Sequence, residues 1–153
     1  MSFTRQKTLI WAFVILFLDQ LTKFLIIMSL EIGQSIVVIP KVFYITHVRN
    51  TGVAFGLAKG FNIIFIIISL FFIVFLLTKY KSILLYFKNK TFLININTII
   101  GMFLGGALGN LVDRIFRGSV VDFLNFVVWP VFNVADSSIT IAGIVLAIYL
   151  FKY

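Results

Sequence analysis

Four long apolar runs constrain the fold of this chain more than any other feature. They cover approximately residues 9–30, 61–77, 92–112 and 134–151. A hydrocarbon core requires a helix of about 17 to 25 residues to cross it, and each run reaches that length. The sequence is 61% apolar and 12% charged, which leaves too little polar surface to cover a water-soluble globule of 153 residues. We therefore predict an all-α membrane protein, a four-transmembrane-helix bundle in a single integral membrane domain over residues 1–153.

The segment between the first two runs, residues 31–60, differs in composition. Ile36 to Ile39 and Val42 to Val48 are rich in β-branched and aromatic residues, and Pro40 separates them. We predict that they form short strands in a small β-rich cradle outside the membrane. A secretory signal peptide would be an alternative for the first run, but that run is too long and no small-residue cleavage site follows it.

The basic residues predict an orientation and argue against a nucleic-acid partner. The net charge is +8, yet the basic residues flank the apolar runs and form no stripe with interleaved aromatics. The positive-inside rule places both termini and the connection between the second and third runs in the cytoplasm. The residues behind that assignment are Arg5, Lys7, Lys79, Lys81, Lys88, Lys90 and Lys152. The extracytoplasmic segments are then residues 31–60 and 113–133.

The chain has no cysteine and one histidine, His47, and this composition argues against two kinds of metal site. A thiolate metal site is impossible without cysteine, and a zinc hydrolase needs more imidazole ligands than one. We expect neither a metal nor an organic cofactor.

Four of the five acidic residues lie in or beside the apolar runs, where a carboxylate is costly and marks a working site. Asp19 and Lys23 have i, i+4 spacing on one helix face, so they either neutralise each other or contact a substrate. For Asp113, which we expect at the outer end of the third helix, an interfacial ion cluster with Arg114 and Arg117 is the favoured interpretation.

Asp122 and Asp136 are the better candidates for reactive groups, because neither has a basic neighbour within four residues. We expect Asp122 in the loop that joins the last two helices and Asp136 at the start of the fourth. Paired aspartates in a partly dry site cannot both ionise cheaply, so one keeps a proton. The anion can then activate water against a peptide carbonyl while its partner donates a proton to the carbonyl oxygen.

Glycines at four-residue spacing in the third run, Gly101, Gly105 and Gly109, predict one smooth helix face that a neighbouring helix approaches closely. Asn110 and Arg114 follow where this face ends. Their polar side chains either hold a peptide backbone or tie helices together.

Two other hypotheses fit parts of the pattern. A small ion or cation transporter would use the charges of Asp19 and Lys23 at mid-membrane. A serine-lysine peptidase would use Ser137 or Ser138 with Lys23.

Five motifs together resemble one family, the lipoprotein signal peptidases or signal peptidase II, bacterial aspartic peptidases of the inner membrane. The motifs span nearly the whole chain and occur in the order of the family: Asp19-Gln20-Leu21-Thr22-Lys23, Asn50 to Gly56, Gly109-Asn110-Leu111-Val112-Asp113-Arg114, Val120-Val121-Asp122-Phe123, and Phe132-Asn133-Val134-Ala135-Asp136. The chain departs from the family at Gly52-Val53-Ala54, where Gly-Ala-Ala is usual, and in a shorter span between the last two aspartates.

The resemblance implies cleavage of prolipoprotein signal peptides immediately before a diacylglyceryl-modified cysteine, at the outer face of the membrane. It implies that Asp122 and Asp136 are the catalytic pair and that Asp113 is structural. The residues implied to line or support the site are Asp19, Lys23, Asn50, Asn110, Arg114 and Asn133. Prolipoproteins and membrane lipids are the expected partners, and we expect a monomer.

Overall fold

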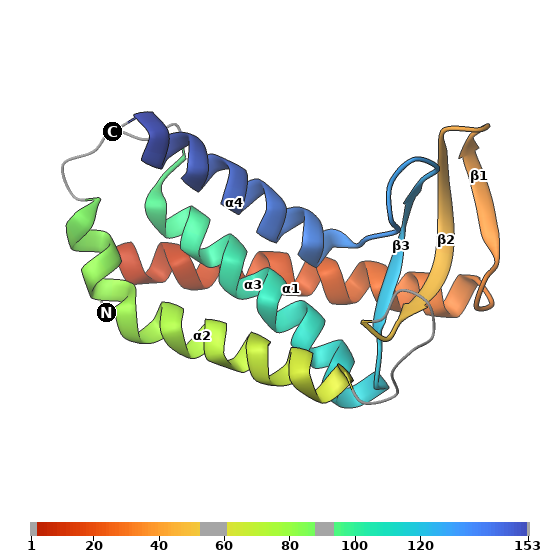
Figure 1. The fold of residues 1–153 in the computed structure, drawn as a ribbon, viewed down its shortest axis with the longest axis horizontal. Coiled ribbons are helices and arrows are strands. Elements are labelled where there is room, and N and C mark those ends of the chain that lie inside the picture. The colour runs from red at the N-terminus through yellow and green to blue at the C-terminus, as the bar shows by residue number, and fades with distance from the viewer. Residues whose placement is uncertain (1–2, 53–60, 88–93, 153) are drawn as a thin grey trace.

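The structure is a computed structural model that describes residues 3–52, 61–87 and 94–152. Figure 1 shows a bundle of helices with a small sheet at one end. The elements in chain order are α1 (Phe3–Ser29), β1 (Ser35–Ile39), β2 (Phe43–Asn50), α2 (Phe61–Tyr86), α3 (Ile96–Arg117), β3 (Val120–Phe126) and α4 (Val134–Lys152). Within the described residues, 4 helices are long and apolar enough to cross a membrane. The predicted fold class is therefore confirmed.

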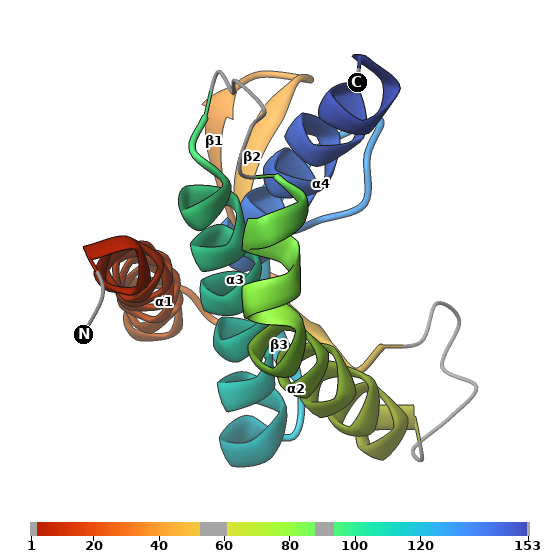
Figure 2. The same cartoon turned by 90° about the vertical axis from the view of Figure 1, so that its left-hand side faces the viewer.

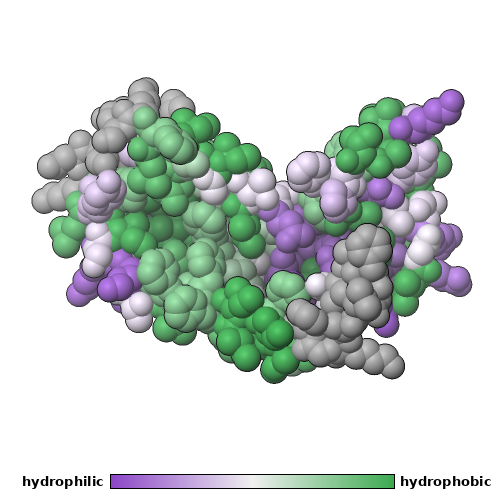
Figure 3. Space-filling view, viewed as in Figure 1, coloured by the Kyte–Doolittle hydropathy of each residue, from purple (hydrophilic) through white to green (hydrophobic). Residues whose placement is uncertain are grey.

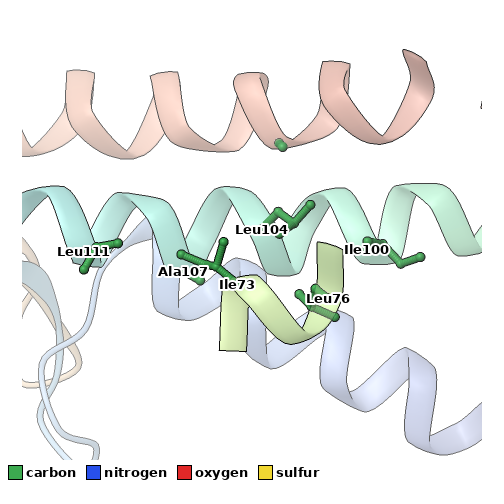
Figure 4. Close-up of a cluster of buried hydrophobic side chains, with 7 residues drawn as sticks. Ile73, Leu76, Ile100, Leu104, Ala107 and Leu111 are labelled. Carbon is green, nitrogen blue, oxygen red and sulfur yellow. The ribbon is translucent and has the colours of Figure 1, made fainter. Parts of the chain in front are cut away.

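Helix α3 forms the centre of the bundle. Figure 2 shows α1 on one side of α3, and α2 and α4 on the other. Leu104, Ala107 and Leu111 of α3 belong to a buried apolar cluster that also contains Ile73 and Leu76 of α2 (Figure 4). Because α3 packs against the other three helices, its polar residues Asn110 and Asp113 are buried.

The glycines of α3 set its close packing on both sides. A Cβ atom at Gly105 would lie 2.6 Å from the Ala12 carbonyl oxygen of α1, and one at Gly101 would lie 2.7 Å from that of Thr8. Gly106 faces the opposite side, where a Cβ would lie 2.7 Å from the Ala135 carbonyl oxygen of α4. The predicted smooth face exists and faces α1.

The three strands form an antiparallel sheet in the order β1-β2-β3. The two strands predicted from the β-branched segment correspond to β1 and β2. The prediction of a loop around Asp122 is wrong, because this residue lies on β3 opposite Val48. Val120, Val121 and Phe123 are buried on that strand, which explains why the segment pairs with β2 instead of remaining open.

Three helices extend well beyond the predicted bounds, and α1 does so at its start, because it begins at Phe3 and not at residue 9. Helix α2 continues past residue 77 to Tyr86, because Lys79 and Lys81 are good helix formers whose long side chains can reach out of the apolar layer. Helix α3 continues past residue 112 to Arg117 and ends at Gly118, which adopts the left-handed conformation with φ of 73°. Asp113 and Arg114 therefore lie inside a helix and not in a connection.

Candidate active site

Asp122 is presented by β3 at the end of the bundle and is only 1% exposed. Its Oδ2 accepts from the Asn50 side-chain amide at 2.8 Å, and its Oδ1 accepts from that of Asn133 at 2.7 Å. Asn50 ends β2, and its own Oδ1 accepts the backbone N–H of Gly52 at 2.8 Å. Burial raises the pKa of Asp122 to about 6, and the charge of Asp136 contributes to the same shift.

Asp136 is placed by the first turn of α4. Asn133 precedes this helix, and its Oδ1 accepts the backbone N–H of Asp136 at 2.9 Å, as an N-cap residue does. The Asp136 carboxylate itself accepts from the Asn110 side-chain amide at 2.7 Å. The cap thus fixes the backbone of Asp136, while α3 fixes the side chain.

Two amide side chains connect the two aspartates. The Nδ2 of Asn133 donates to Asn110 Oδ1 at 3.1 Å as well as to Asp122. Since Asn110 donates in turn to Asp136, a continuous chain of hydrogen bonds runs between the two carboxylates. Of the salt bridges among described residues, each involves Asp19 or Asp113 and none involves Asp122 or Asp136. The two reactive candidates are therefore held by neutral donors.

Lys23 lies at the centre of a buried ionic cluster beneath the site. Its Nζ is 2.8 Å from Asp19 Oδ2 and 3.0 Å from Asp113 Oδ2, and all three side chains are 0% exposed. It also donates to Asn110 Oδ1 at 2.9 Å. Of the two alternatives for Asp19 and Lys23, the structure shows the ion pair. These bonds occupy the lysine fully, and nothing favours a transporter.

Arg114 brings a positive charge close to both aspartates. Its guanidinium interacts electrostatically with Asp136 and Asp122, and its central carbon lies 5.1 Å from the centre of the Phe65 ring. The favoured interpretation grouped Asp113 with Arg114 and Arg117 in an ion cluster. Arg117 does form a salt bridge to Asp113, whereas Arg114 interacts with Asp113 electrostatically without a salt bridge. Arg114 is thus a positively charged group that interacts with both aspartates.

The serine-lysine hypothesis is not supported by the geometry. The Ser138 hydroxyl donates to the Met102 carbonyl at 2.9 Å, and the Ser137 hydroxyl donates to the Asn133 carbonyl at 2.8 Å. The first bond joins α4 to α3 and the second is local to the start of α4, while Lys23 is engaged by carboxylates. Neither serine has the adjacent base that would activate it.

Sequence reasoning missed two residues of the site. Gln20 donates to Asp19 Oδ2 at 3.1 Å, to Asp113 Oδ1 at 3.2 Å and to the Gly109 carbonyl at 3.1 Å. Its position beside Asp19 was the available signal. Phe65 is one of 19 phenylalanines, so nothing in the sequence distinguished it.

Part of the predicted site cannot be compared with the structure. Residues 53–60, which include most of the turn-rich segment after Asn50, lie outside the described residues. Among the residues that are described, no three histidine, cysteine or acidic side chains gather as metal ligands.

Comparison with known proteins identifies the family. A family model described as signal peptidase (SPase) II matches residues 11–152. This chain belongs to the signal peptidase II family. The lipoprotein signal peptidase of Halothermothrix orenii is 42% identical over 139 residues, which cover 91% of each chain. That of Bacillus subtilis is 39% identical over 143 residues, covering 91% of this chain and 89% of the relative.

Solved structures of two bacterial membrane enzymes share the fold. One, at 2.3 Å resolution, has a TM-score of 0.79 and 34% identity over 95% of this chain and 87% of its own. The other, at 1.9 Å, has a TM-score of 0.76 and 36% identity over 95% of this chain and 92% of its own. The resemblance to signal peptidase II is therefore confirmed, as is the prediction of a multi-pass membrane peptidase of the aspartic type.

Proposed function

We propose that this chain is a membrane-embedded aspartic endopeptidase that removes signal peptides from prolipoproteins, with Asp122 and Asp136 as its catalytic pair. Cleavage would occur immediately before a diacylglyceryl-modified cysteine. The observation that carries the proposal is the hydrogen-bonded chain from Asp122 through Asn133 and Asn110 to Asp136. It holds two carboxyl groups from separate elements in one shielded place without neutralising either by a direct cation.

The pair can hydrolyse a peptide bond with water alone. We assign the proton of the pair to Asp122, because burial raises the pKa of this residue to about 6. As water adds to the carbonyl carbon, its proton passes to Asp136 and the Asp122 proton passes to the carbonyl oxygen. When the resulting diol collapses, Asp136 returns a proton to the leaving amine, and a diol hydroxyl returns one to Asp122. Both carboxyl groups are then as they were before the reaction.

The surrounding residues take supporting roles in this proposal. Asn110 and Asn133 orient the carboxyl groups, and Asn50 fixes the outer oxygen of Asp122. Arg114 provides a positive charge toward a peptide carbonyl or the developing diol. The cluster of Asp19, Lys23 and Asp113 positions the elements that carry the pair, and Gly105 and Gly109 allow α1 to lie close enough for it.

For the location, we propose the bacterial inner membrane, with both termini in the cytoplasm and the site at the outer face. The basic residues Lys7, Lys79 and Lys81 lie on helix portions remote from the aspartates, as the positive-inside rule requires. Large apolar side chains cover the outside of the bundle, and Phe71, for example, is 73% exposed. This surface suits direct contact of a single chain with lipid.

The proposal is tested with purified protein in vesicles and a prolipoprotein that carries diacylglyceryl-cysteine. The Asp122→Asn and Asp136→Asn variants should each lose cleavage, while a variant with alanine at both Ser137 and Ser138 should keep it. A substrate with an unmodified cysteine is the matched control and should remain uncut. Substantial cleavage by either asparagine variant, or loss of activity in the serine variant alone, would contradict the aspartic mechanism.

A further inference from the structure

We propose that the end of the bundle remote from the aspartates binds an anionic phospholipid, with an acyl chain in a cavity between α2, α3 and α4 and the phosphate at Lys79. The cavity has a volume of about 620 Å³. This is within the range of about 300–1,000 Å³ that is typical of small-molecule sites. It is separate from the site of Asp122 and Asp136, whose residues do not line it.

The lining of the cavity matches a hydrocarbon chain. Phe75 and Leu76 of α2, Ile99 and Phe103 of α3, and Leu146 of α4 are among its walls. Figure 3 shows mainly hydrophobic residues over the middle of the helices, in the same view as Figure 1, with hydrophilic residues toward the end of the bundle. An apolar cavity in a membrane-facing surface is filled by the apolar solvent around it, which is lipid.

Polar groups in the lining indicate where the headgroup lies. Lys79 and Ser82 line the cavity, and both side chains are exposed. Lys79 is 7 residues before the end of α2 at Tyr86, or about 10 Å along the helix. A lysine stem spans part of that depth along apolar surface while its ammonium reaches the headgroup layer.

The positive charge of the lysines at this end of the bundle favours an anionic lipid headgroup. The Thr8 and Tyr80 hydroxyls lie 3.3 Å apart, so the start of α1 with Lys7 and the end of α2 with Lys79 and Lys81 are neighbours. No acidic residue occurs in the sequence between residues 32 and 112 or after residue 136. A basic pocket between membrane helices favours an acidic lipid headgroup.

Native mass spectrometry of the protein released from vesicles of equal parts phosphatidylglycerol and phosphatidylcholine tests the proposal. The wild type should retain phosphatidylglycerol in preference to phosphatidylcholine. Lys79→Gln should lower that preference about fivefold, whereas Lys81→Gln, on the same helix but outside the cavity, should change it less than about twofold. Ser82→Trp should fill the cavity and reduce the retained lipid about fivefold or more, and Leu85→Trp, exposed outside the lining, should not.

Several results would overturn the site. They are an equal retention of both lipids by the wild type, equal losses in Lys79→Gln and Lys81→Gln, or unchanged lipid in Ser82→Trp. A dimer mass without lipid would show that a second copy of the chain covers the cavity instead. Thermal unfolding in detergent, expected to be unchanged in all four variants, confirms that each loss of lipid reflects binding and not misfolding.

Discussion

The carboxylate of Asp19 accepts the backbone N–H of Ala135 at 2.9 Å, so α1 holds the residue that directly precedes Asp136. Asp113 has the same relationship to the other candidate, because its Oδ2 accepts the backbone N–H of Val121 at 3.0 Å. Lys23 bonds both carboxylates. One buried lysine therefore connects the supports of the two catalytic candidates, which lie on β3 and α4.

Replacing Lys23 with methionine should strongly destabilise the protein. The change leaves Asp19 and Asp113 buried without their shared cation, and breaking a buried ion pair costs about 3–5 kcal/mol. Denaturant unfolding in detergent measures the loss. Lys81→Met, at an exposed position, is the control and should change the free energy of unfolding by less than about 0.5 kcal/mol. A Lys23→Met variant as stable as this control would show that the cluster does not hold the bundle.

Gly105→Ala should separate α1 from α3. The new methyl group would lie 2.6 Å from the Ala12 carbonyl oxygen, and a backbone atom cannot move aside as a side chain can. We expect a loss of about 1–3 kcal/mol in the free energy of unfolding. Gly143→Ala is the matched control, because no atom lies within 4 Å of its added Cβ, and it should be neutral or slightly stabilising. Equal effects of the two changes would mean that close α1–α3 contact is not required.

Asn133→Ser separates capping from catalysis. Serine can still accept the Asp136 N–H and cap α4, but it cannot donate to Asp122 or bridge to Asn110. Stability should remain within about 1 kcal/mol of the wild type. The value of kcat should fall about 10- to 100-fold, since the carboxyl group of Asp122 loses the hydrogen bond that orients it. Asn133→Ala should lower both the stability and kcat, because it removes the cap and the bridge. Full activity in Asn133→Ser would show that the bridge is not needed for catalysis.

The raised pKa of Asp122, about 6, predicts how stability depends on pH. Between about pH 4 and 6 the folded protein holds a proton on Asp122 that the unfolded chain has released, so the free energy of unfolding should fall as pH rises. Each unit by which the folded pKa is raised corresponds to about 1.4 kcal/mol. Asp122→Asn cannot titrate and should lack this slope. Parallel pH profiles for the variant and the wild type would show that Asp122 is not the group responsible.

Most of the fold could be predicted because its signals are local. Apolar length identified the four spans, and the β-branched segment around Pro40 identified β1 and β2. Strand β3 was missed, because its pairing with β2 joins residues 70 or more positions apart and no local pattern marks such a contact. The end of α3 was missed too, since Gly118 was not recognised as the residue that ends the helix.

In the candidate site too, contacts within one helix could be predicted from the sequence, but contacts between elements could not. The i, i+4 spacing of Asp19 and Lys23 allowed an ion pair to be foreseen, but its partner Asp113 comes from another helix. The bridge between Asn110 and Asn133 depends on how α3 packs against the start of α4, which motifs alone cannot show. These contacts between elements therefore became visible only in the packed structure.

A double-mutant cycle in kcat/KM most directly tests whether Asp122 and Asp136 act as one catalytic unit. The Asp122→Asn, Asp136→Asn and double variants are compared on diacylglyceryl-modified prolipoprotein in vesicles. We predict that each single variant loses at least about 10³-fold and that the double variant loses no more, because groups that act together are not additive. Losses that multiply in the double variant, or a single variant that keeps about a tenth of the activity or more, would contradict this account.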